Sequence, residues 1–387
     1  MSVAPKRSRL ASRQSATELV RQHVRDLIIT RGLRPGAVLP TYHELCADLG
    51  VAYLTVKRGM DLLEAEGIID CIKGKGSFVN RELSRQGRPL KTLGIVHQAS
   101  HSHLFTAPFL QQIMQGIGAG HARFDMNIFT MREDGFVTAA QLADRNVDGV
   151  ILLGVENQDF LRECEEWDLP CVVADTCADG IALDFVACDN AACAQAAVAH
   201  VVAKGHRHIR YLGGTPRQNI MIGGSPGLSM EIVQTDSIER RAAVAREAGK
   251  YPGVRFDEVI NSWLSYNRHE ANALYADLIS RWRSESDRPT VLMVDSDIGA
   301  GDLIQELAKQ GIRVPGDVSV CAVAGCGVSA SGGMSIAQGR CDFRGMGRKA
   351  VELLRWRCEH PAEALPPAVY RVGFEWEEGG STREARA

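Results

Sequence analysis

Residues 39–79 read LPTYHELCADLGVAYLTVKRGMDLLEAEGIIDCIKGKGSFV, and this stretch decides the fold of the first part of the chain. Thr41 can cap a helix, and Glu44 stands where the second member of a capping box belongs, so a helix is predicted from here to Gly50. After a short turn, residues 54–65 show the apolar spacing of a second helix. Its inward residues are expected to be Val56, Met60, Leu62 and Leu63.

The pattern extends on both sides of these two helices. Upstream, apolar residues recur at helical spacing from Ala16 to Thr30, and Gly32 ends the element. Downstream, residues 68–72 and 77–79 predict two strands, joined by a glycine-bearing turn. Three helices followed by a hairpin with a basic tip predict a winged helix-turn-helix. We assign it to residues 15–80, after a flexible basic arm of residues 1–14.

Charge separates this segment from the rest of the chain. The formal net charge of the whole chain is −3. Residues 1–91 carry 16 Lys and Arg against 9 Asp and Glu, a net charge of +7, and the remaining residues carry 28 against 38, a net charge of −10. Phosphate attraction depends on local positive charge, so a polyanion partner is expected for the front segment alone.

The front segment resembles the DNA-binding domain of the GntR family of bacterial regulators over about 65 residues. The motifs that carry the resemblance are Leu39-Pro40-Thr41, Glu44-Leu45, Leu49-Gly50-Val51, Thr55-Val56-Lys57-Arg58, residues 63–69 and residues 74–79. The resemblance implies that the third helix enters the major groove of double-stranded DNA, while the wing reaches adjacent phosphates or the minor groove.

The family's DNA contacts can be transferred to individual positions. They fall on Thr41, His43, Tyr53, Leu54, Thr55, Lys57 and Arg58, and on the wing residues Lys73, Gly74, Lys75 and Gly76. His43 and Tyr53 stand where arginines are common in the family. A lost arginine removes a reader of guanine worth about 1–3 kcal/mol of discrimination, so the family's operator preference is not transferred to this chain.

A polar segment, residues 81–91, is expected to link the winged domain to a second module. From Thr92 onward, short apolar strands alternate with helices, as in residues 149–153 and 171–174. This alternation predicts an α/β fold with doubly wound parallel sheets. About nine expected strands are too many for one typical sheet, which indicates two lobes over residues 92–376 and a tail of residues 377–387.

This second module resembles the effector domain of LacI/GalR repressors, a two-lobed fold related to periplasmic sugar-binding proteins. The strings that carry the resemblance are residues 147–151, 169–173 and 205–214, Asp189-Asn190, residues 311–320 and residues 346–350. A GntR-type head on such a module resembles regulators of the arabinose-repressor type. The resemblance implies a carbohydrate effector bound between the lobes and a homodimer on an operator.

Ligand positions are transferred with the same resemblance. Residues 237–243 match the start of a helix whose arginine reaches ligand hydroxyls, which nominates Arg240. Trp263 follows a strand after which family members place a residue that faces the cleft, and Asp297 aligns with a hydroxyl-binding acid. Alternatives remain, because Arg240 can be a solvated charge, Trp263 a core residue and Asp297 a helix cap. Phe109 matches a first-lobe aromatic position. The sequence departs from the family at Ala324-Gly325 and in the glycine-rich residues 215–236.

Other classes of protein are weaker interpretations. Eleven cysteines without a C-x-x-C pair predict buried thiols in a reducing cytoplasm, with no metal site and no cofactor. No apolar run is long enough to span a membrane. Residues 223–227 match G-x-S-x-G, but Pro226 cannot donate the N–H that an oxyanion hole needs after Ser225, so an enzyme is not expected. Residues 116–120 predict a closely packed interfacial helix.

The sequence thus predicts a cytoplasmic, ligand-responsive transcriptional regulator, and more specifically a repressor. The alternative is a small-molecule sensor whose winged head docks a protein partner instead of DNA.

Overall fold

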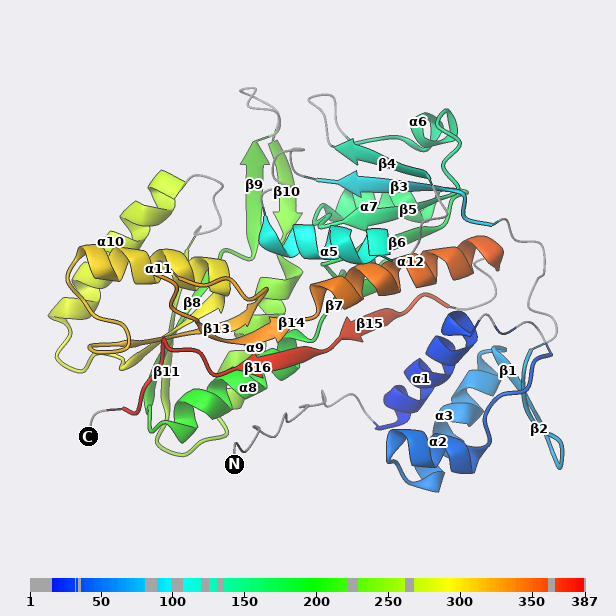
Figure 1. The fold of residues 1–387 in the computed structure, drawn as a ribbon, viewed down its shortest axis with the longest axis horizontal. Coiled ribbons are helices and arrows are strands. Elements are labelled where there is room, and N and C mark those ends of the chain that lie inside the picture. The colour runs from blue at the N-terminus through cyan, green and yellow to red at the C-terminus, as the bar shows by residue number, and fades with distance from the viewer. Residues whose placement is uncertain are drawn as a thin grey trace, which may run out of the picture.

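The computed structural model of the chain is drawn in Figure 1. It describes residues 16–31, 33, 36–80, 89–98, 107–119, 125–130, 136–221, 229–261, 268–330, 332–360 and 366–385. These residues form a small head and a body made of two α/β lobes (Figure 1). Among them, no helix is long and apolar enough to cross a membrane.

The head contains helices α1 (Ala16–Thr30), α2 (Tyr42–Leu49) and α3 (Tyr53–Ala65) and the antiparallel hairpin β1 (Ile69–Ile72) and β2 (Gly76–Val79). The predicted capping box is present, because Glu44 N–H donates to Thr41 Oγ1 while Thr41 N–H donates to Glu44 Oε2. Val56, Met60 and Leu63 are fully buried. The expectation for Leu62 is wrong, since it is 45% exposed on the outer side of α3.

The first lobe is built on a parallel six-stranded sheet with the order β15-β7-β6-β5-β3-β4. Its inner strands β5 and β6 are fully buried runs of apolar residues, as expected for a sheet covered by helices on both faces. The strands are β3 (Thr92–His97), β4 (Asp125–Thr130), β5 (Gly149–Leu153), β6 (Cys171–Ala174), β7 (Asp184–Cys188) and β15 (Val369–Val372). The helices are α5 (Pro108–Ala119), α6 (Ala139–Ala143), α7 (Gln158–Glu165) and α12 (Phe343–Glu359).

The second lobe carries a sheet with the order β11-β8-β12-β13-β14-β16, parallel except for the antiparallel β14–β16 pair. The strands are β8 (His208–Gly214), β11 (Arg255–Asn261), β12 (Val291–Ser296), β13 (Ser319–Gly325), β14 (Ala337–Cys341) and β16 (Phe374–Glu377). The helices are α8 (Asn190–Ala203), α9 (Thr235–Ala248), α10 (Arg268–Ser284) and α11 (Asp297–Lys309). A separate hairpin consists of β9 (Arg217–Met221) and β10 (Ser229–Val233).

The chain crosses between the lobes three times, after β7, after β14 and after β15 (Figure 1). Of the strands that border these crossovers, β7, β14, β15 and β16 were not predicted from the sequence. Beside the second crossover, α5 packs closely on α12. A Cβ on Gly116 would lie 2.1 Å from the Arg344 carbonyl oxygen, and one on Gly347 would lie 2.1 Å from the Ile113 carbonyl oxygen. Both positions therefore need glycine, and the expected close packing of this helix is found within the chain.

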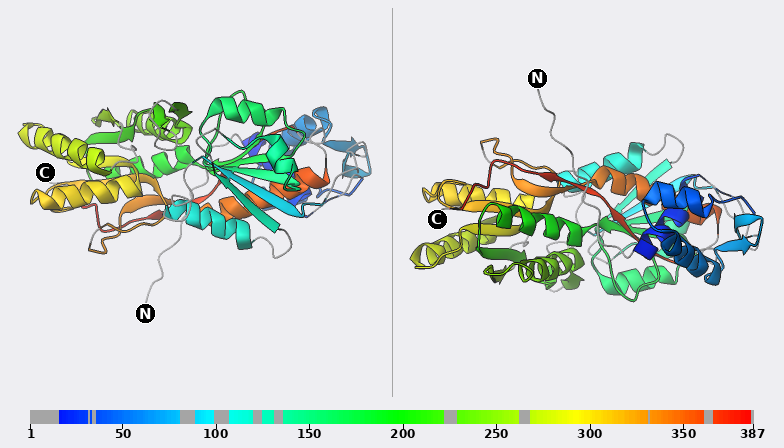
Figure 2. Two further views of the ribbon diagram at one scale, coloured as in Figure 1. Left: turned by 90° about the horizontal axis from the view of Figure 1, so that it is seen from above. Right: turned by 90° about the horizontal axis from the view of Figure 1, so that it is seen from below.

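The head lies at the first-lobe end of the molecule, beside α12 (Figure 2). Lys349 of α12 is paired with Asp26 of α1, and its ammonium also lies 5.1 Å from the centre of the Tyr370 ring. Thus α1 is the helix of the head that meets the body. The candidate DNA-binding surface lies on another helix of the head, α3, and is described below.

The expected tail needs a correction, because residues 378–385 belong to the second lobe. Ser381 is fully buried, and its hydroxyl donates to the Val320 carbonyl oxygen at 2.6 Å and accepts from the Ala337 N–H at 3.0 Å. Further along, Ala385 N–H donates to the Lys204 carbonyl oxygen at 2.8 Å. This segment leaves the antiparallel edge strand β16 and fills the space beside β13, so the packed domain extends to residue 385.

Candidate DNA-binding surface and effector pocket

The first candidate site is the outer side of α3. Tyr53 and Leu54 are 48% and 68% exposed, and Lys57 and Arg58 are also exposed, whereas Val56 is buried. Helical periodicity explains why the exposed residues alternate with buried ones, since the side chains that face the head core recur every three or four positions. Lys57 has a weak surface ion pair with Asp61 at 3.9 Å, which leaves its ammonium available to a stronger anion.

His43 and Tyr53, the two departures from the family pattern, lie side by side. Their ring centres are 5.7 Å apart, and the Tyr42 ring lies 5.6 Å from that of Tyr53. The three rings bring the start of α2 and the start of α3 together on one exposed edge. Where arginines would offer charged donors to guanine, this chain offers an aromatic edge with a phenol and an imidazole. Such an edge can accept and donate single hydrogen bonds and can contact a thymine methyl group.

The wing places two lysines at the tip of the hairpin. Lys73 and Lys75 are exposed, and Lys75 N–H donates to the Ile72 carbonyl oxygen at 2.9 Å to close the turn. Gly74 and Gly76 have φ values of 77° and 114°, a region of backbone conformation that favours glycine. The glycines therefore shape the turn, and the lysines supply its positive charge.

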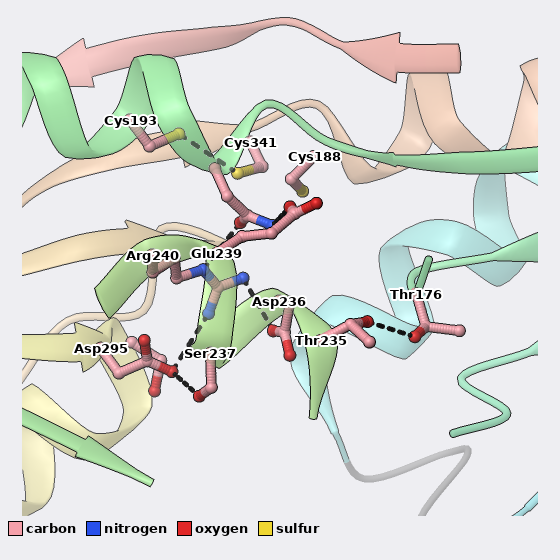
Figure 3. Close-up of polar contacts among 12 residues, drawn as sticks. Thr176, Cys188, Cys193, Thr235, Asp236, Ser237, Glu239, Arg240, Asp295 and Cys341 are labelled. Atoms are coloured by element: carbon pink, nitrogen blue, oxygen red, sulfur yellow. Dashed lines mark hydrogen bonds and ion pairs between the residues drawn. The ribbon is translucent and has the colours of Figure 1, made fainter. Parts of the chain in front are cut away.

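The second candidate site is a pocket between the two lobes, shown in Figure 3. It lies at the carboxyl ends of β6 and β7 in the first lobe and at the start of α9 in the second lobe. Ligands of open α/β sheets bind at this edge of the strands. The residues that line the pocket are Asp175, Thr176, Cys177, Ala187, Cys188, Asn190, Thr235, Asp236, Glu239, Arg240 and Arg371.

Arg240 is the centre of a network of polar contacts in this pocket (Figure 3). Its Nε donates to Asn190 Oδ1 at 2.8 Å, and its guanidinium is paired with Asp236 at 3.0 Å and with Asp295 at 3.4 Å. Asp295, at the end of β12, also accepts from the Tyr211 and Ser237 hydroxyls at 2.6 and 2.7 Å. Every polar group named here thus has a partner, and the network holds Arg240 in one orientation.

A second part of the network joins the two lobes directly. Arg371 of β15 donates to both carboxylate oxygens of Glu239 on α9, at 2.6 and 2.9 Å. Glu239 also accepts from Asn190 Nδ2 at 2.8 Å. Nearby, the hydroxyls of Thr176 and Thr235 are 3.1 Å apart and share a hydrogen bond across the cleft. These contacts describe a cleft with its lobes closed.

Burial shifts the pKa values of the charged groups in the pocket. It raises the pKa of Asp175 well above its usual range, and the nearby carboxylate of Asp236 adds to the effect. Burial likewise raises the pKa of Asp236, an increase that the charge of Arg240 opposes. For Arg240, burial acts against the charged form, yet Asp236 and Asp295 together raise its pKa. Arg240 is therefore a permanent cation near two carboxyl groups, those of Asp175 and Asp236, whose pKa values are raised.

Backbone strain and the size of the cavity are two further features of this pocket. Asp175 has a φ of 77°, a strained value for a residue other than glycine, and such strain clusters at functional sites. The cavity between the lining residues measures about 10 Å³. This is the space for about one water molecule, so an effector the size of a sugar requires the lobes to move apart.

The structure places the predicted ligand residues differently with respect to the pocket. Arg240 lies in the pocket, as expected from its place near the start of α9. Phe109 is half-buried between α5 and α12, with its ring centre 5.8 Å from that of Phe343, and it is not among the lining residues. Trp263 lies outside the described residues.

Asp297 is 2% exposed and is engaged elsewhere. Its Oδ2 accepts the backbone N–H groups of Cys326 and Val328, both at 2.9 Å, and Ser296 takes the role of helix cap. The departure at Gly325 has a physical reason, because a Cβ there would lie 2.3 Å from Cγ of Asp297. The side chain of Asp297 thus occupies the space that a side chain at Gly325, the last residue of β13, would need.

The sequence interpretation missed most of the pocket, although two signals for it were present. Asp175 directly follows the predicted strand 171–174, and Asp189-Asn190 stand before a predicted helix, so both mark the carboxyl edge of the first sheet. Asp236 precedes Arg240 by one helical turn. By contrast, Arg371 lies on a strand that was not predicted, and no local signal points to it.

Comparison with known protein families agrees with this two-part architecture. Residues 16–79 match the model described as bacterial regulatory proteins, gntR family. Residues 198–382 match the periplasmic binding protein-like domain. The first match spans the head, and the second begins in α8 and spans the second lobe together with α12 and β15.

Individual proteins give the same result. The chain is 22% identical to the arabinose metabolism transcriptional repressor of Geobacillus stearothermophilus, over 78% of this chain and 79% of that protein. The solved complex of the transcriptional regulator CelR with cellobiose superposes with a TM-score of 0.59 at 18% identity, over 89% of this chain and all of that chain. The lac repressor dimer bound to its operator and an anti-inducer gives a TM-score of 0.57 at 16% identity, over 76% and 95% of the two chains.

These matches are to regulators and not to enzymes, and Ser225 of the G-x-S-x-G string lies outside the described residues. The chain is therefore a transcriptional regulator in which a head that matches the gntR family of bacterial regulatory proteins is joined to a periplasmic binding protein-like domain.

Proposed function

We propose that this regulator is a homodimeric repressor that releases or grips a palindromic operator in response to a carbohydrate bound between its lobes. The observation that carries the proposal is the interlobe pocket around Arg240, which combines a fixed cation, several carboxylates and an amide. Donors and acceptors in alternation are what neighbouring hydroxyls of a sugar require, since each hydroxyl both donates and accepts. The arabinose repressor and the cellobiose complex among the similar proteins support this ligand class.

On the DNA side, α3 supplies the contacts to base edges, and the wing supplies contacts to phosphates. Tyr53, Leu54 and Thr55 at the start of α3 are the base-reading residues of the proposal, with Thr41 and His43 beside them. Lys57, Arg58, Lys73 and Lys75 provide the electrostatic part of the affinity. Two heads held at a fixed separation would read two half-sites, as the two-fold symmetry of a dimer requires.

On the ligand side, Arg240, Asp236 and Asn190 are the direct contacts of the proposal. Opening the lobes would expose Asp175 from the first lobe and Asp236 from the second on opposite walls of the cleft. Asp297 keeps a positioning role, since its carboxylate holds the backbone of residues 326–328 at the edge of the second lobe. Phe109 and Trp263 remain candidates from the family resemblance alone.

The pocket and the head communicate in this proposal through a shared wall. A groove of about 1180 Å³ separates Arg21 and Arg25 of α1 from α8 and α9 of the body. Asn190, Glu239 and Arg371 line both this groove and the effector pocket. Because Arg371 belongs to the first lobe and Glu239 to the second, any change in lobe closure alters their ion pair and the groove beside the head. The ligand then acts by its different affinity for the two arrangements.

A ligand screen on the full chain tests the effector part of the proposal. Monosaccharides, sugar acids and oligosaccharides are added singly, and the melting temperature is measured, because a ligand that binds the folded state stabilises it by mass action. Arg240→Lys should lose the shift that the best compound gives. Arg241→Lys is the matched control, since Arg241 is the next residue of α9 and pairs with Glu258 away from the pocket.

The DNA part is tested by gel shift with genomic fragments at several salt concentrations. A sequence-selective complex that weakens as salt rises is expected, because bound lysines and arginines displace counterions. If none of the carbohydrates shifts the melting temperature of a chain that binds DNA in this way, the carbohydrate assignment is wrong. If no selective complex forms, the head does not act on DNA.

A further inference from the structure

Three cysteines meet where the chain crosses between the lobes (Figure 3). Cys188 is the last residue of β7, just before the first crossover, and Cys193 lies in the first turn of α8, just after it. Cys341 is the last residue of β14, just before the second crossover. Neither the DNA-binding surface nor the proposed effector contacts use these thiols, although they adjoin the pocket.

The sulfur atoms are close enough to react after a small movement. Cys193 Sγ and Cys341 Sγ are 3.9 Å apart, and a disulfide bond requires about 2.0 Å. Gly339, two residues before Cys341 on the same face of β14, makes room for this approach. A Cβ at Gly339 would lie 3.0 Å from Cys193 Sγ and would press it away from its present position.

The local electrostatics distinguish Cys341 from the other buried thiols. Hydrogen bonds from Cys188 and Cys193, together with the charge of Arg240, hold the pKa of Cys341 below the usual range of a thiol. Cys321 on the neighbouring strand β13 lacks such donors, and burial raises its pKa. Since the thiolate is the nucleophile in thiol oxidation, Cys341 is the member of the cluster best able to attack an oxidant.

A route to this cluster exists from the effector pocket. Cys188 lines the interlobe cavity together with Arg240, and its own sulfur is hydrogen-bonded to Cys341. The closed cavity has space for about one water molecule, and opening the lobes widens it. When the lobes open, a small uncharged oxidant such as hydrogen peroxide can approach the cluster from the side of Cys188, whereas the closed cavity is too small for bulky reagents.

We propose that Cys193 and Cys341 form a redox-active dithiol, oxidised to an intramolecular disulfide by hydrogen peroxide. The sulfur of Cys341 attacks the peroxide, the O–O bond breaks, and one oxygen leaves as water while the other forms a sulfenic acid on Cys341. Cys193 then attacks that sulfur, the S–S bond forms, and the second oxygen leaves as water. Two thiols lose two electrons and two protons, and hydrogen peroxide gains them to give two water molecules.

Peptide mapping of the full chain tests the pairing. The reduced protein, freed of reductant, is treated with increasing hydrogen peroxide, its remaining thiols are alkylated, and it is digested without reduction. We expect one linked pair of peptides that contains Cys193 and Cys341, lighter than their sum by two hydrogens and separated by dithiothreitol. A linkage between Cys188 and Cys341, linkages only between chains, or Cys341 still alkylated when surface thiols are oxidised would each overturn the proposal.

Variants test the order of events. In Cys193→Ser the sulfenic acid on Cys341 loses its partner, so dimedone present while the oxidised protein is unfolded in urea should label Cys341 several-fold more than in the unaltered chain. Cys321→Ser is the matched control, a buried thiol on the adjacent strand, and it should leave both the linked peptide and the labelling unchanged. Dimedone on Cys193 in Cys341→Ser, with none on Cys341 in Cys193→Ser, would show that the assigned attacking residue is wrong. The mapping of the unaltered chain stands even if a variant does not fold.

Discussion

On the head, Tyr53, Lys57 and Lys75 stand in solvent on one continuous stretch of chain, whereas the pocket residues Arg240 and Asn190 are buried and paired with each other. The exposed side chains contribute little to folding, because their surroundings barely change when the chain folds. The buried side chains must satisfy one another before any ligand arrives. A substitution at one of these exposed head residues should therefore change DNA affinity alone, while one in the pocket changes stability together with ligand response.

The largest effect expected from this contrast is on Asp295→Ala. The change removes the acceptor of the Tyr211 and Ser237 hydroxyls and one of the two carboxylates beside Arg240. Breaking a buried charge pair in this way should lower the free energy of unfolding by about 3–5 kcal/mol. Unfolding by urea, followed for the variant and the unaltered chain, measures this loss of free energy. Asp287→Ala is the control, since the exposed ion pair of Asp287 with Arg255 is worth less than about 1 kcal/mol.

On the head, changing both Lys57 and Lys75 to alanine is expected to alter DNA affinity and not stability. Two lost phosphate contacts should flatten the dependence of log affinity on log salt by about 2, with the urea midpoint unchanged. Binding to an operator fragment at four salt concentrations gives the slope. Lys309→Ala, on α11 of the second lobe, should alter neither quantity. A lower urea midpoint in the double variant would remove the contrast between head and pocket.

Asp175 offers a test of the pocket by pH. Burial raises the pKa of this carboxyl in the folded chain, so the folded state binds more protons than the unfolded state above the unfolded pKa of about 4. Stability should therefore fall as pH rises from about 4 towards the folded pKa. Asp175→Asn removes this dependence and should raise the melting temperature more at pH 8 than at pH 5. Equal shifts at both pH values would mean that Asp175 ionises freely.

The smallest effect is expected for Thr41→Ala. The hydroxyl of Thr41 accepts the Glu44 N–H at the start of α2, and losing a helix cap costs about 1 kcal/mol. Thr41→Ser should keep the cap and most of the stability. Because Thr41 is also a proposed DNA contact, affinity and stability are expected to change together at this position.

The head could be predicted in detail because its information is local. The capping box at Thr41, the stop at Gly50 and the glycines of the wing each act within a few residues. Leu62 was misplaced because an apolar residue on a helix flanked by others was assigned to the core, while the structure leaves it on the surface.

The pocket could be predicted only in part because its residues come together from distant elements. Arg240 was found through the family resemblance, while Glu239 and Arg371 meet only when α9 packs near β15. Strands β7 and β14, which lead into the first two crossovers, are five residues each, and β14 reads AQGRC, with no β-branched residue to mark it. The pivot between the lobes was therefore the part that the sequence pattern did not reveal.

The placement of Ser381 against β13 has a consequence for synthesis on the ribosome. The head is complete once residue 79 has been made, and it can fold while the rest of the chain is still being translated. The second lobe begins with α8 but lacks its edge strand β16 and the Ser381 hydroxyl until residue 381 has emerged. In a nascent chain the head can thus be folded well before the second lobe, which is part of the proposed sensor, is complete.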